Sequence, residues 1–293
     1  MSDPLRILSL GAGVQSTALL LMSIKGILPR IDHAIFADTQ YEPPAVYTHL
    51  AWLEEQAQAA GIPLHKVTAG NLRTEALAFR ERAEAGVGRA SLPVFIKNPD
   101  GSRGIVRRQC TSAYKIEPIE RFIRRNILGA KPGGRIPKDA PKVDQWFGIT
   151  SDEIQRMRDS RETWQRNVYP FCGRFGDDML PRPYSRQDCL AWLRDHYPDR
   201  HIPRSACIAC PFRRDHEWRA MRDNDPESWA DAVRFDEEMR AADRSGQCKR
   251  KILVGLPFLH DSLKPLGEVD LSTDMDRGQM SLWNNECEGI CGV

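Results

Sequence analysis

Two cysteines spaced to share a metal stand in the stretch SACIACPFR, as Cys207 and Cys210. Two intervening residues let both thiolates reach one ion or one iron–sulfur cluster, so an unrelated pair of core cysteines is the weaker interpretation. A redox pair is also possible, although the context typical of thioredoxin is missing. A metal site needs two further ligands, and the candidates are Cys110, Cys172, Cys248, Cys287 and Cys291, while Cys189 lies in an amphipathic stretch typical of a core.

A glycine-bearing turn near the N-terminus, in RILSLGAGVQS, could hold an anion. An apolar strand precedes the turn, and a helical pattern over residues 17–25 follows it. Free N–H groups at a helix start attract negative charge, glycine lets the backbone approach a phosphate, and Ser16 can donate from the first turn. Gly11 and Gly13 therefore predict a phosphate loop, and the alternative is an ordinary strand-to-helix connection.

The elements after this turn predict a parallel sheet. Strands are expected over His33–Asp38 and Leu64–Thr68, with a helix over residues 45–60 between them. Alternating strands and helices favour right-handed crossovers and ligand binding beyond the carboxyl ends of the strands. Asp38 and Thr39 fall at that edge with the glycine turn. Asp38 could accept a hydrogen bond from a ribose hydroxyl or an adenine amino group, or could cap the next turn.

The rest of the chain predicts more helix and a second lobe. We expect a helix over residues 72–85, followed by a mobile loop or lid over residues 86–108. A new segment begins at Cys110, and its second half should form a helix. A strand is expected over residues 143–149. Ser185 should cap a helix, and residues 226–244 should form a charged amphipathic one. The expected division is an α/β domain over residues 1–197 and a smaller, cysteine-bearing helical lobe over residues 198–293.

Composition limits the class of protein. A chain of 293 residues that is 41% hydrophobic can fill a full core, and its formal charge of +2 is too small for general nucleic-acid binding. No run approaches the roughly 18 apolar residues of a membrane span, and the N-terminus lacks the pattern of a signal peptide. These features predict a cytoplasmic protein without membrane contact, in which eight cysteines are more typical of ligands, catalytic thiols or core residues than of disulfides.

Five segments together resemble the adenylyl-sulfate and phosphoadenylyl-sulfate reductase family, within the adenine-nucleotide α-hydrolase-like group (PP-loop superfamily) that includes ATP pyrophosphatases. GAGVQS stands where that group has its phosphate loop, and DTQYEPPAVY is similar to the family's D-T-G-x-x-x-P-E-T-Y segment. CTSAYKIEPI is similar to C-C-x-x-x-K-x-x-P-L, and WFGITSDEIQRMRDSR to W-x-x-G-x-R-x-x-E-S-x-x-R. The C-x-x-C pair and a final E-C-x-G pattern complete the series, whose order is specific.

The resemblance implies a doubly wound, mainly parallel α/β sheet and assigns roles to residues. Ser9, Gly11, Gly13, Gln15 and Ser16 would bind an adenine nucleotide, with Asp38 and Thr39 facing the adenosine. Lys115, Arg158 and Arg161 would neutralise developing sulfonyl or phosphate charge. Cys110, Cys207, Cys210 and Cys287 would hold a [4Fe-4S] cluster, with zinc as the alternative, and Cys291 would attack sulfur to form a thiosulfonate.

Two departures from the family pattern leave alternatives open. Gln15 replaces the aspartate that helps ATP pyrophosphatases hold magnesium, and Thr111 follows Cys110 where cluster-bearing reductases have a second cysteine. We expect thiol-dependent reduction of adenylyl sulfate or phosphoadenylyl sulfate, and the candidate partners are a thioredoxin-like reductant and a second copy of the chain in a homodimer. The alternatives are an ATP-dependent, cluster-dependent sulfurtransferase, with magnesium, that acts on tRNA or DNA, and a non-enzymatic nucleotide-binding module with structural zinc.

Overall fold

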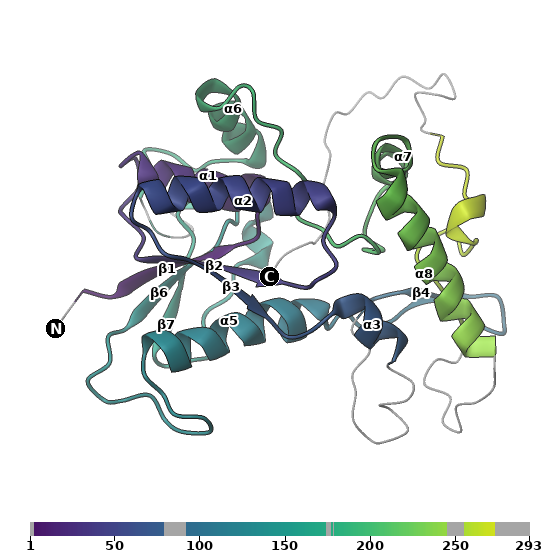
Figure 1. The fold of residues 1–293 in the computed structure, drawn as a ribbon, viewed down its shortest axis with the longest axis horizontal. Helices are drawn as coiled ribbons and strands as arrows, with labels where there is room; N and C mark the ends of the chain where they lie inside the picture. Colours follow the sequence, from purple (N-terminus) through teal and green to yellow (C-terminus); the bar gives the residue numbers. More distant parts are fainter. Residues whose placement is uncertain (1–2, 79–91, 174–176, 178, 245–254, 273–293) are drawn as a thin grey trace.

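A parallel sheet of five strands forms the centre of the larger lobe (Figure 1). The computed structural model describes residues 3–78, 92–173, 177, 179–244 and 255–272. The strand order is β3 (Leu64–Thr68), β2 (His33–Asp38), β1 (Leu5–Leu10), β6 (Val143–Trp146) and β7 (Gln165–Val168). Every neighbouring pair is parallel. The α/β prediction is confirmed at this level, and β1, β2 and β3 lie where strands were expected. The strand expected over residues 143–149 is shorter, because β6 ends at Trp146.

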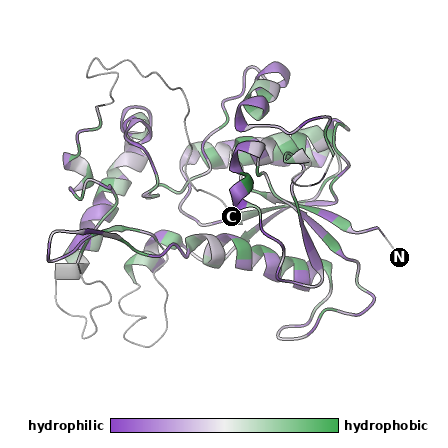
Figure 2. Cartoon of the chain, turned by 180° about the vertical axis from the view of Figure 1, so that it is seen from behind, coloured by the Kyte–Doolittle hydropathy of each residue, from purple (hydrophilic) through white to green (hydrophobic). Residues whose placement is uncertain are grey.

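Helices cover both faces of this sheet because each presents an apolar side to it. On one face lie α1 (Val14–Ile24) and α2 (Pro44–Ala59), and α6 (Arg186–His196) packs against α1. The other face carries one continuous helix, made of the π-helical turn η1 (Ser112–Ile116), α5 (Glu117–Phe122) and the π-helical turn η2 (Ile123–Ile127). Figure 2 shows hydrophobic residues along these helices and strands.

The helix α2 (Pro44–Ala59) begins at a proline, and its buried side faces the same core as α1. Ser185 caps α6 as predicted, because its Oγ accepts from the N–H of Asp188 while the Asp188 carboxylate accepts from the N–H of Ser185. Cys189 lies on this helix and is fully buried in the core, which confirms the interpretation of Cys189 as a core residue.

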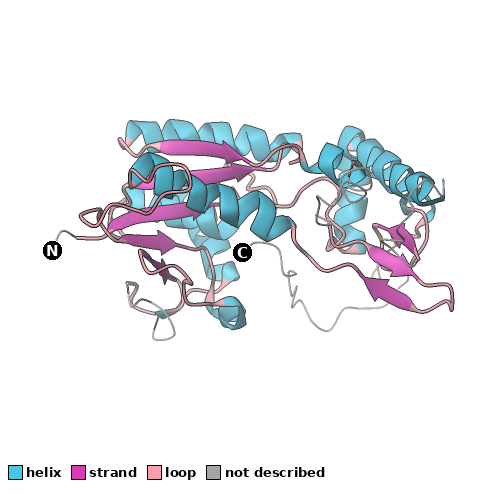
Figure 3. Ribbon diagram, turned by 90° about the horizontal axis from the view of Figure 1, so that it is seen from below, coloured by secondary structure: helices cyan, strands magenta, loops and turns pink. Residues whose placement is uncertain are grey.

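A second, smaller sheet and several helices form the other lobe, which Figure 3 shows set apart from the main sheet. The antiparallel order is β5 (Arg103–Ile105), β4 (Phe95–Lys97) and β8 (Leu256–Phe258). Around it lie α3 (Leu72–Leu77), α7 (Asp215–Asn224), α8 (Pro226–Arg244) and the 3-10 turn η5 (Leu266–Glu268). The bounds of α8 agree with the expected helix over residues 226–244.

The structure corrects three expectations. Residues 86–108 do not form only a loop, because β4 and β5 lie within them, and the smaller lobe is therefore not purely helical. Its hydrophobic core also takes residues from before position 197, including Tyr41, Leu72 and Tyr114. The helix expected over residues 72–85 ends at Leu77, and residues 79–91 lie outside the described part of the chain. The strand β7 was not expected at all.

In the part of the chain that the structure describes, every helix is too short or too polar to pass through a lipid bilayer.

Candidate functional site

The glycine turn links β1 to α1 and leaves the start of the helix open. Gly13 is the N-cap residue, and no side chain caps the helix there. The first intrahelical bond runs from the N–H of Thr17 to the carbonyl of Gly13, at 2.9 Å. Ser16 stabilises the turn because its Oγ accepts from the N–H of Gly11 at 3.1 Å. The free N–H groups of the first helical turn can therefore receive an anion.

A cavity beside this turn, called here the loop cavity, has walls from several elements. Ser9, Gly11, Gly13, Gln15 and Ser16 all line it, so five of the predicted nucleotide-binding residues lie together. The other lining residues that matter below are Lys115, Gln145, Phe147, Gly148 and Ser205.

Gln145 and Gly148 were missed by the sequence analysis, although both stand at the end of the predicted strand over residues 143–149. Gln145 is only 2% exposed and donates from Nε2 to Ser9 Oγ at 2.7 Å. A Cβ atom on Gly148 would lie 2.9 Å from the backbone nitrogen of Ser16. These two residues fix the wall of the loop cavity against the glycine turn.

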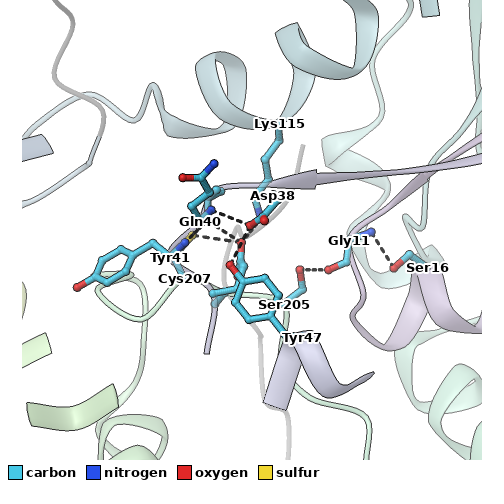
Figure 4. Close-up of polar contacts among 12 residues, drawn as sticks. Gly11, Ser16, Asp38, Gln40, Tyr41, Tyr47, Lys115, Ser205 and Cys207 are labelled. Atoms are coloured by element: carbon cyan, nitrogen blue, oxygen red, sulfur yellow. Dashed lines mark hydrogen bonds and ion pairs between the residues drawn. The ribbon is translucent and has the colours of Figure 1, made fainter. Parts of the chain in front are cut away.

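The segment that carries the two paired cysteines lies directly against the glycine turn (Figure 4). Ser205 Oγ donates a hydrogen bond to the carbonyl of Gly11. A Cβ atom on Gly13 would lie 3.0 Å from Ser205 Cβ, so only glycine allows this approach. Nothing in the sequence marks Ser205 apart from its place two residues before Cys207.

Asp38 does not line the loop cavity. Its Oδ1 accepts from the N–H of Gln40 at 2.7 Å and from the hydroxyl of Tyr47 at 2.9 Å (Figure 4). Burial and the neighbouring Asp38 carboxylate raise the pKa of Tyr47. Asp38 therefore holds the turn after β2 in place, which matches the capping alternative, and its contact with adenosine stays a prediction.

Thr39 lies at a sulfur atom rather than in the loop cavity. Its hydroxyl is 3.4 Å from Cys207 Sγ and donates to Glu42 Oε1 at 3.0 Å. Glu42 is 4% exposed, accepts from the Cys207 thiol at 3.5 Å, and lies 3.7 Å from Lys115 Nζ. Its second oxygen, Oε2, has no hydrogen-bond partner. The sequence analysis missed Glu42, because its distance from position 207 in the chain conceals this contact.

Three of the predicted ligands line a second, smaller cavity. Cys110, Cys207 and Cys210 share its wall with Thr39 and Lys115, and this set is called here the cysteine cavity. Burial, with a smaller effect of the Glu42 carboxylate, raises the pKa of Cys207 to about 12, so this thiol is protonated at neutral pH when no metal binds it.

The remaining cysteines divide into two groups. Cys172 is buried away from the cysteine cavity and donates to the carbonyl of Ile149 at 3.3 Å, which removes it from the candidate ligands. Burial raises its pKa to about 11. Cys248, Cys287 and Cys291 lie outside the described residues, so the predicted fourth ligand and the predicted nucleophile are not placed.

The donor set fits a thiolate-bound metal only in part. Three thiols around one cavity suit zinc or an iron–sulfur cluster, both of which prefer soft sulfur ligands. Both groups need a fourth donor, which the described residues do not supply as a cysteine. No set of three or more His, Cys, Asp or Glu side chains in the described ranges is close enough to hold a single metal ion.

Arg158 and Arg161 line a third cavity, of about 680 Å³, called here the arginine cavity. It adjoins the loop cavity, because Ile116, Gln145 and Phe147 line both. Arg158 donates to the carbonyls of Gln155 and Met157, at 2.7 and 2.6 Å. Neither arginine lines the loop cavity, so their role at a bound nucleotide stays a prediction.

A half-buried carboxylate lies behind the glycine turn. Glu153, in the 3-10 turn η3 (Ser151–Arg156), accepts from Gln15 Nε2 at 3.4 Å and pairs with Arg156. Burial raises the pKa of Glu153 although Arg156 opposes the change. Gln15 is therefore held by a neighbouring element at the position where the resemblance expects an aspartate.

Comparison of the chain with protein-family models, curated proteins and solved structures finds no match in any of the three.

Proposed function

We propose that this chain is an adenine-nucleotide-binding enzyme that performs sulfur chemistry at cysteines beside the nucleotide. The observation that carries the proposal is the shared wall between the two sites, since Lys115 and Ser205 line both the loop cavity and the cysteine cavity. An anion at the open start of α1 would thus lie next to a charged amine and a set of thiols. The resemblance to the phosphoadenylyl-sulfate reductase family makes reduction of adenylyl sulfate or phosphoadenylyl sulfate the first reaction to test.

In this reaction the backbone of the glycine turn holds phosphate or sulfate oxygens, and Lys115 offsets the charge that develops on the leaving phosphate. A cysteine thiolate, for which Cys291 is the candidate, attacks the sulfur atom. The bond from sulfur to the phosphate oxygen breaks, the nucleotide monophosphate leaves, and an enzyme thiosulfonate forms. A dithiol reductant of the thioredoxin type then supplies two electrons and becomes a disulfide, which releases sulfite and restores the thiolate.

Cys110, Cys207 and Cys210 would hold a [4Fe-4S] cluster, with Cys287 as the proposed fourth ligand. A bound cluster would place a centre of positive iron and soft sulfur beside the nucleotide. Glu42 and Lys115 would be its charged protein neighbours, since both lie against Cys207 or in the wall of the cysteine cavity.

Metal analysis separates the cofactor alternatives. Protein purified without oxygen should be brown and contain about four irons per chain. Serine variants of Cys110, Cys207 and Cys210 should lose most of that iron, while Cys189→Ser, a matched change of a buried core cysteine, should keep it. Colourless protein with one zinc per chain would refute the cluster and leave the zinc site.

Turnover assays separate the reactions. Sulfite release from adenylyl sulfate or phosphoadenylyl sulfate, dependent on a dithiol, supports reduction, and Lys115→Ala should lower its rate. Binding of neither sulfated nucleotide nor ATP, measured by calorimetry, would end the proposal.

The arginine cavity favours a second candidate, an ATP-dependent sulfurtransferase. A transfer reaction needs room for an acceptor beside the nucleotide, and the loop cavity has a larger neighbour with its own arginines. Incorporation of sulfur into tRNA or DNA, with release of pyrophosphate from ATP, would support this reaction over reduction.

A further inference from the structure

We propose that the arginine cavity binds one unpaired base of a nucleic-acid strand, with the flanking phosphates on its arginines. This inference rests on the second candidate above, because it names the acceptor class of a transfer reaction. Its starting point is the lining of the cavity, which combines aromatic rings, side-chain amides and arginines. That combination is how proteins hold single-stranded bases, by stacking, by hydrogen bonds to base edges and by phosphate contacts.

The aromatic part is a stacked pair. The rings of Phe147 and Tyr169 have their centroids 5.9 Å apart and are inclined by 28°. Tyr169 is buried and fixed, because its hydroxyl donates to the carbonyl of Arg158 at 2.6 Å and accepts from the N–H of Arg158 at 3.0 Å. Phe147 is partly exposed and lines both the arginine cavity and the loop cavity. Phe147 is therefore a supported ring on which a base can stack beside the nucleotide.

Two glutamine side chains in the wall of the arginine cavity have amide oxygens without a hydrogen-bond partner among the described residues. Gln145 is 2% exposed. Its Nε2 donates to Ser9 Oγ, and its Oε1 has no hydrogen-bond partner among the described residues. Gln165 donates from Nε2 to Asn167 Oδ1 at 3.1 Å and also leaves Oε1 unbonded. An unmet buried acceptor is unfavourable, and the exocyclic amino group of a base can satisfy it. Both glutamines line the arginine cavity.

Both signs of charge line the cavity. Arg156, Arg158 and Arg161 come from η3 and the residues after it, and so do the carboxylates of Asp159 and Glu162, while Glu117 and Glu120 come from α5. The Arg161 side chain is exposed and makes no hydrogen bond or ion pair with any residue that the structure describes. Phosphates would be repelled by the two α5 carboxylates and attracted to Arg161. A strand would thus pass Arg161 with its base turned inward toward Gln145.

The test uses short single-stranded RNA and DNA oligonucleotides with one central 2-aminopurine, and matched oligonucleotides with an abasic site there. We expect the fluorescence of 2-aminopurine to be quenched on binding, and the base-containing strand to bind about 5- to 150-fold more tightly than the abasic one. Phe147→Leu should remove most of this difference. Tyr184→Leu, which changes a stacked ring outside the cavity, should leave it unchanged.

Arg161→Ala should weaken the base-containing and the abasic strand alike, and should lower the slope of log affinity against log salt by about one. Arg194→Ala, an exposed arginine on α6, is its matched control. Thermal melts of each variant establish that it folds, and Gln165→Leu gives a second change in the cavity if Phe147→Leu does not fold.

Equal binding of base-containing and abasic strands, or equal binding by Phe147→Leu and the parent protein, would overturn the inference. Calorimetry with ATP and with adenylyl sulfate on the same samples keeps this outcome separate from the proposed function. Protein that binds the nucleotide but does not distinguish the base refutes only the base site, whereas protein that binds no adenine nucleotide refutes the proposed function as well. The tighter of the RNA and DNA strands identifies the class of acceptor.

Discussion

Replacing Gly148 by alanine should disturb the start of α1 through a backbone contact. The new Cβ atom would lie 2.9 Å from the nitrogen of Ser16, 3.0 Å from Gln15 Cβ and 3.1 Å from the carbonyl carbon of Gln15. Two of these three atoms are backbone, which cannot rotate away as a side chain can. Residue 148, which follows β6, and the first turn of α1 must therefore move apart.

The size of the effect follows from the cost of overpacking. Extra methyl groups in packed regions cost about 1–3 kcal/mol, and we expect about 2 kcal/mol here because the backbone must shift. For a chain of this length, with an unfolding entropy of about 2.1 cal/mol/K per residue, that corresponds to a fall in Tm of about 3 °C. Since the shifted atoms are those that would receive the anion, nucleotide affinity should fall by at least about tenfold, as a tenfold change corresponds to about 1.4 kcal/mol.

The assay combines thermal unfolding with calorimetry of ATP and adenylyl sulfate binding. Gly104→Ala is the matched control, because a Cβ atom there would have only ordinary contacts, the nearest at 3.6 Å from Asn98 Nδ2. We expect Gly104→Ala to leave nucleotide affinity unchanged. Normal nucleotide binding by a folded Gly148→Ala protein would show that the start of α1 is not the anion site, and the reasoning would be wrong.

Three further predictions concern stability. Burial, with the neighbouring Arg200 and His201, lowers the pKa of His49 to about 4. Because the unfolded chain then binds more protons than the folded chain between pH 6.5 and 4, the free energy of unfolding should fall by about 3 kcal/mol as the pH is lowered over that window. His49→Gln should reduce this fall in urea titrations. Ser185→Ala should cost about 1 kcal/mol by calorimetry, because it removes the cap of α6. Asp236→Ala should cost about 3–5 kcal/mol in urea, because it leaves Arg240 buried without its partner and frees the N–H groups of Leu259 and Leu266. An unchanged midpoint for any of these would contradict its stated contact.

The sequence predicted the larger lobe well because that lobe is built from local signals. The apolar runs of β1 and β2 and the helical period of α2 each lie within one short stretch, and parallel order follows from their alternation. The glycine turn was recognisable because glycine and serine act there through the backbone. Cys207 and Cys210 were grouped by their spacing, and Cys110 was assigned with them through the resemblance.

The smaller lobe was harder to predict because its contacts are distant in the sequence. β4 and β5 have three residues each, too few to show a period, and β4 pairs with β8, in which Phe258 is the partner of Phe95. β7 reads QRNV, in which only Val168 is buried and apolar. Glu42 and Ser205 meet their partners across more than 150 residues, and nothing local marks such contacts.

The segment with the paired cysteines is attached to two strand ends at once. The N–H of Ile208 donates to the carbonyl of Tyr41 at 2.9 Å, just after β2, and Ser205 donates to Gly11, just after β1. Between these two bonds lies Cys207, whose thiol reaches Glu42 and Thr39. A group bound by Cys207 would therefore change the position of residues that also contact the glycine turn. Because coupling between two ligands is reciprocal, a nucleotide in the loop cavity would in turn alter the affinity of the thiols for a metal. Under the proposed function, the backbone segment of four residues from Ser205 to Ile208 would therefore link the nucleotide site to the thiols, in addition to the wall that the two cavities share.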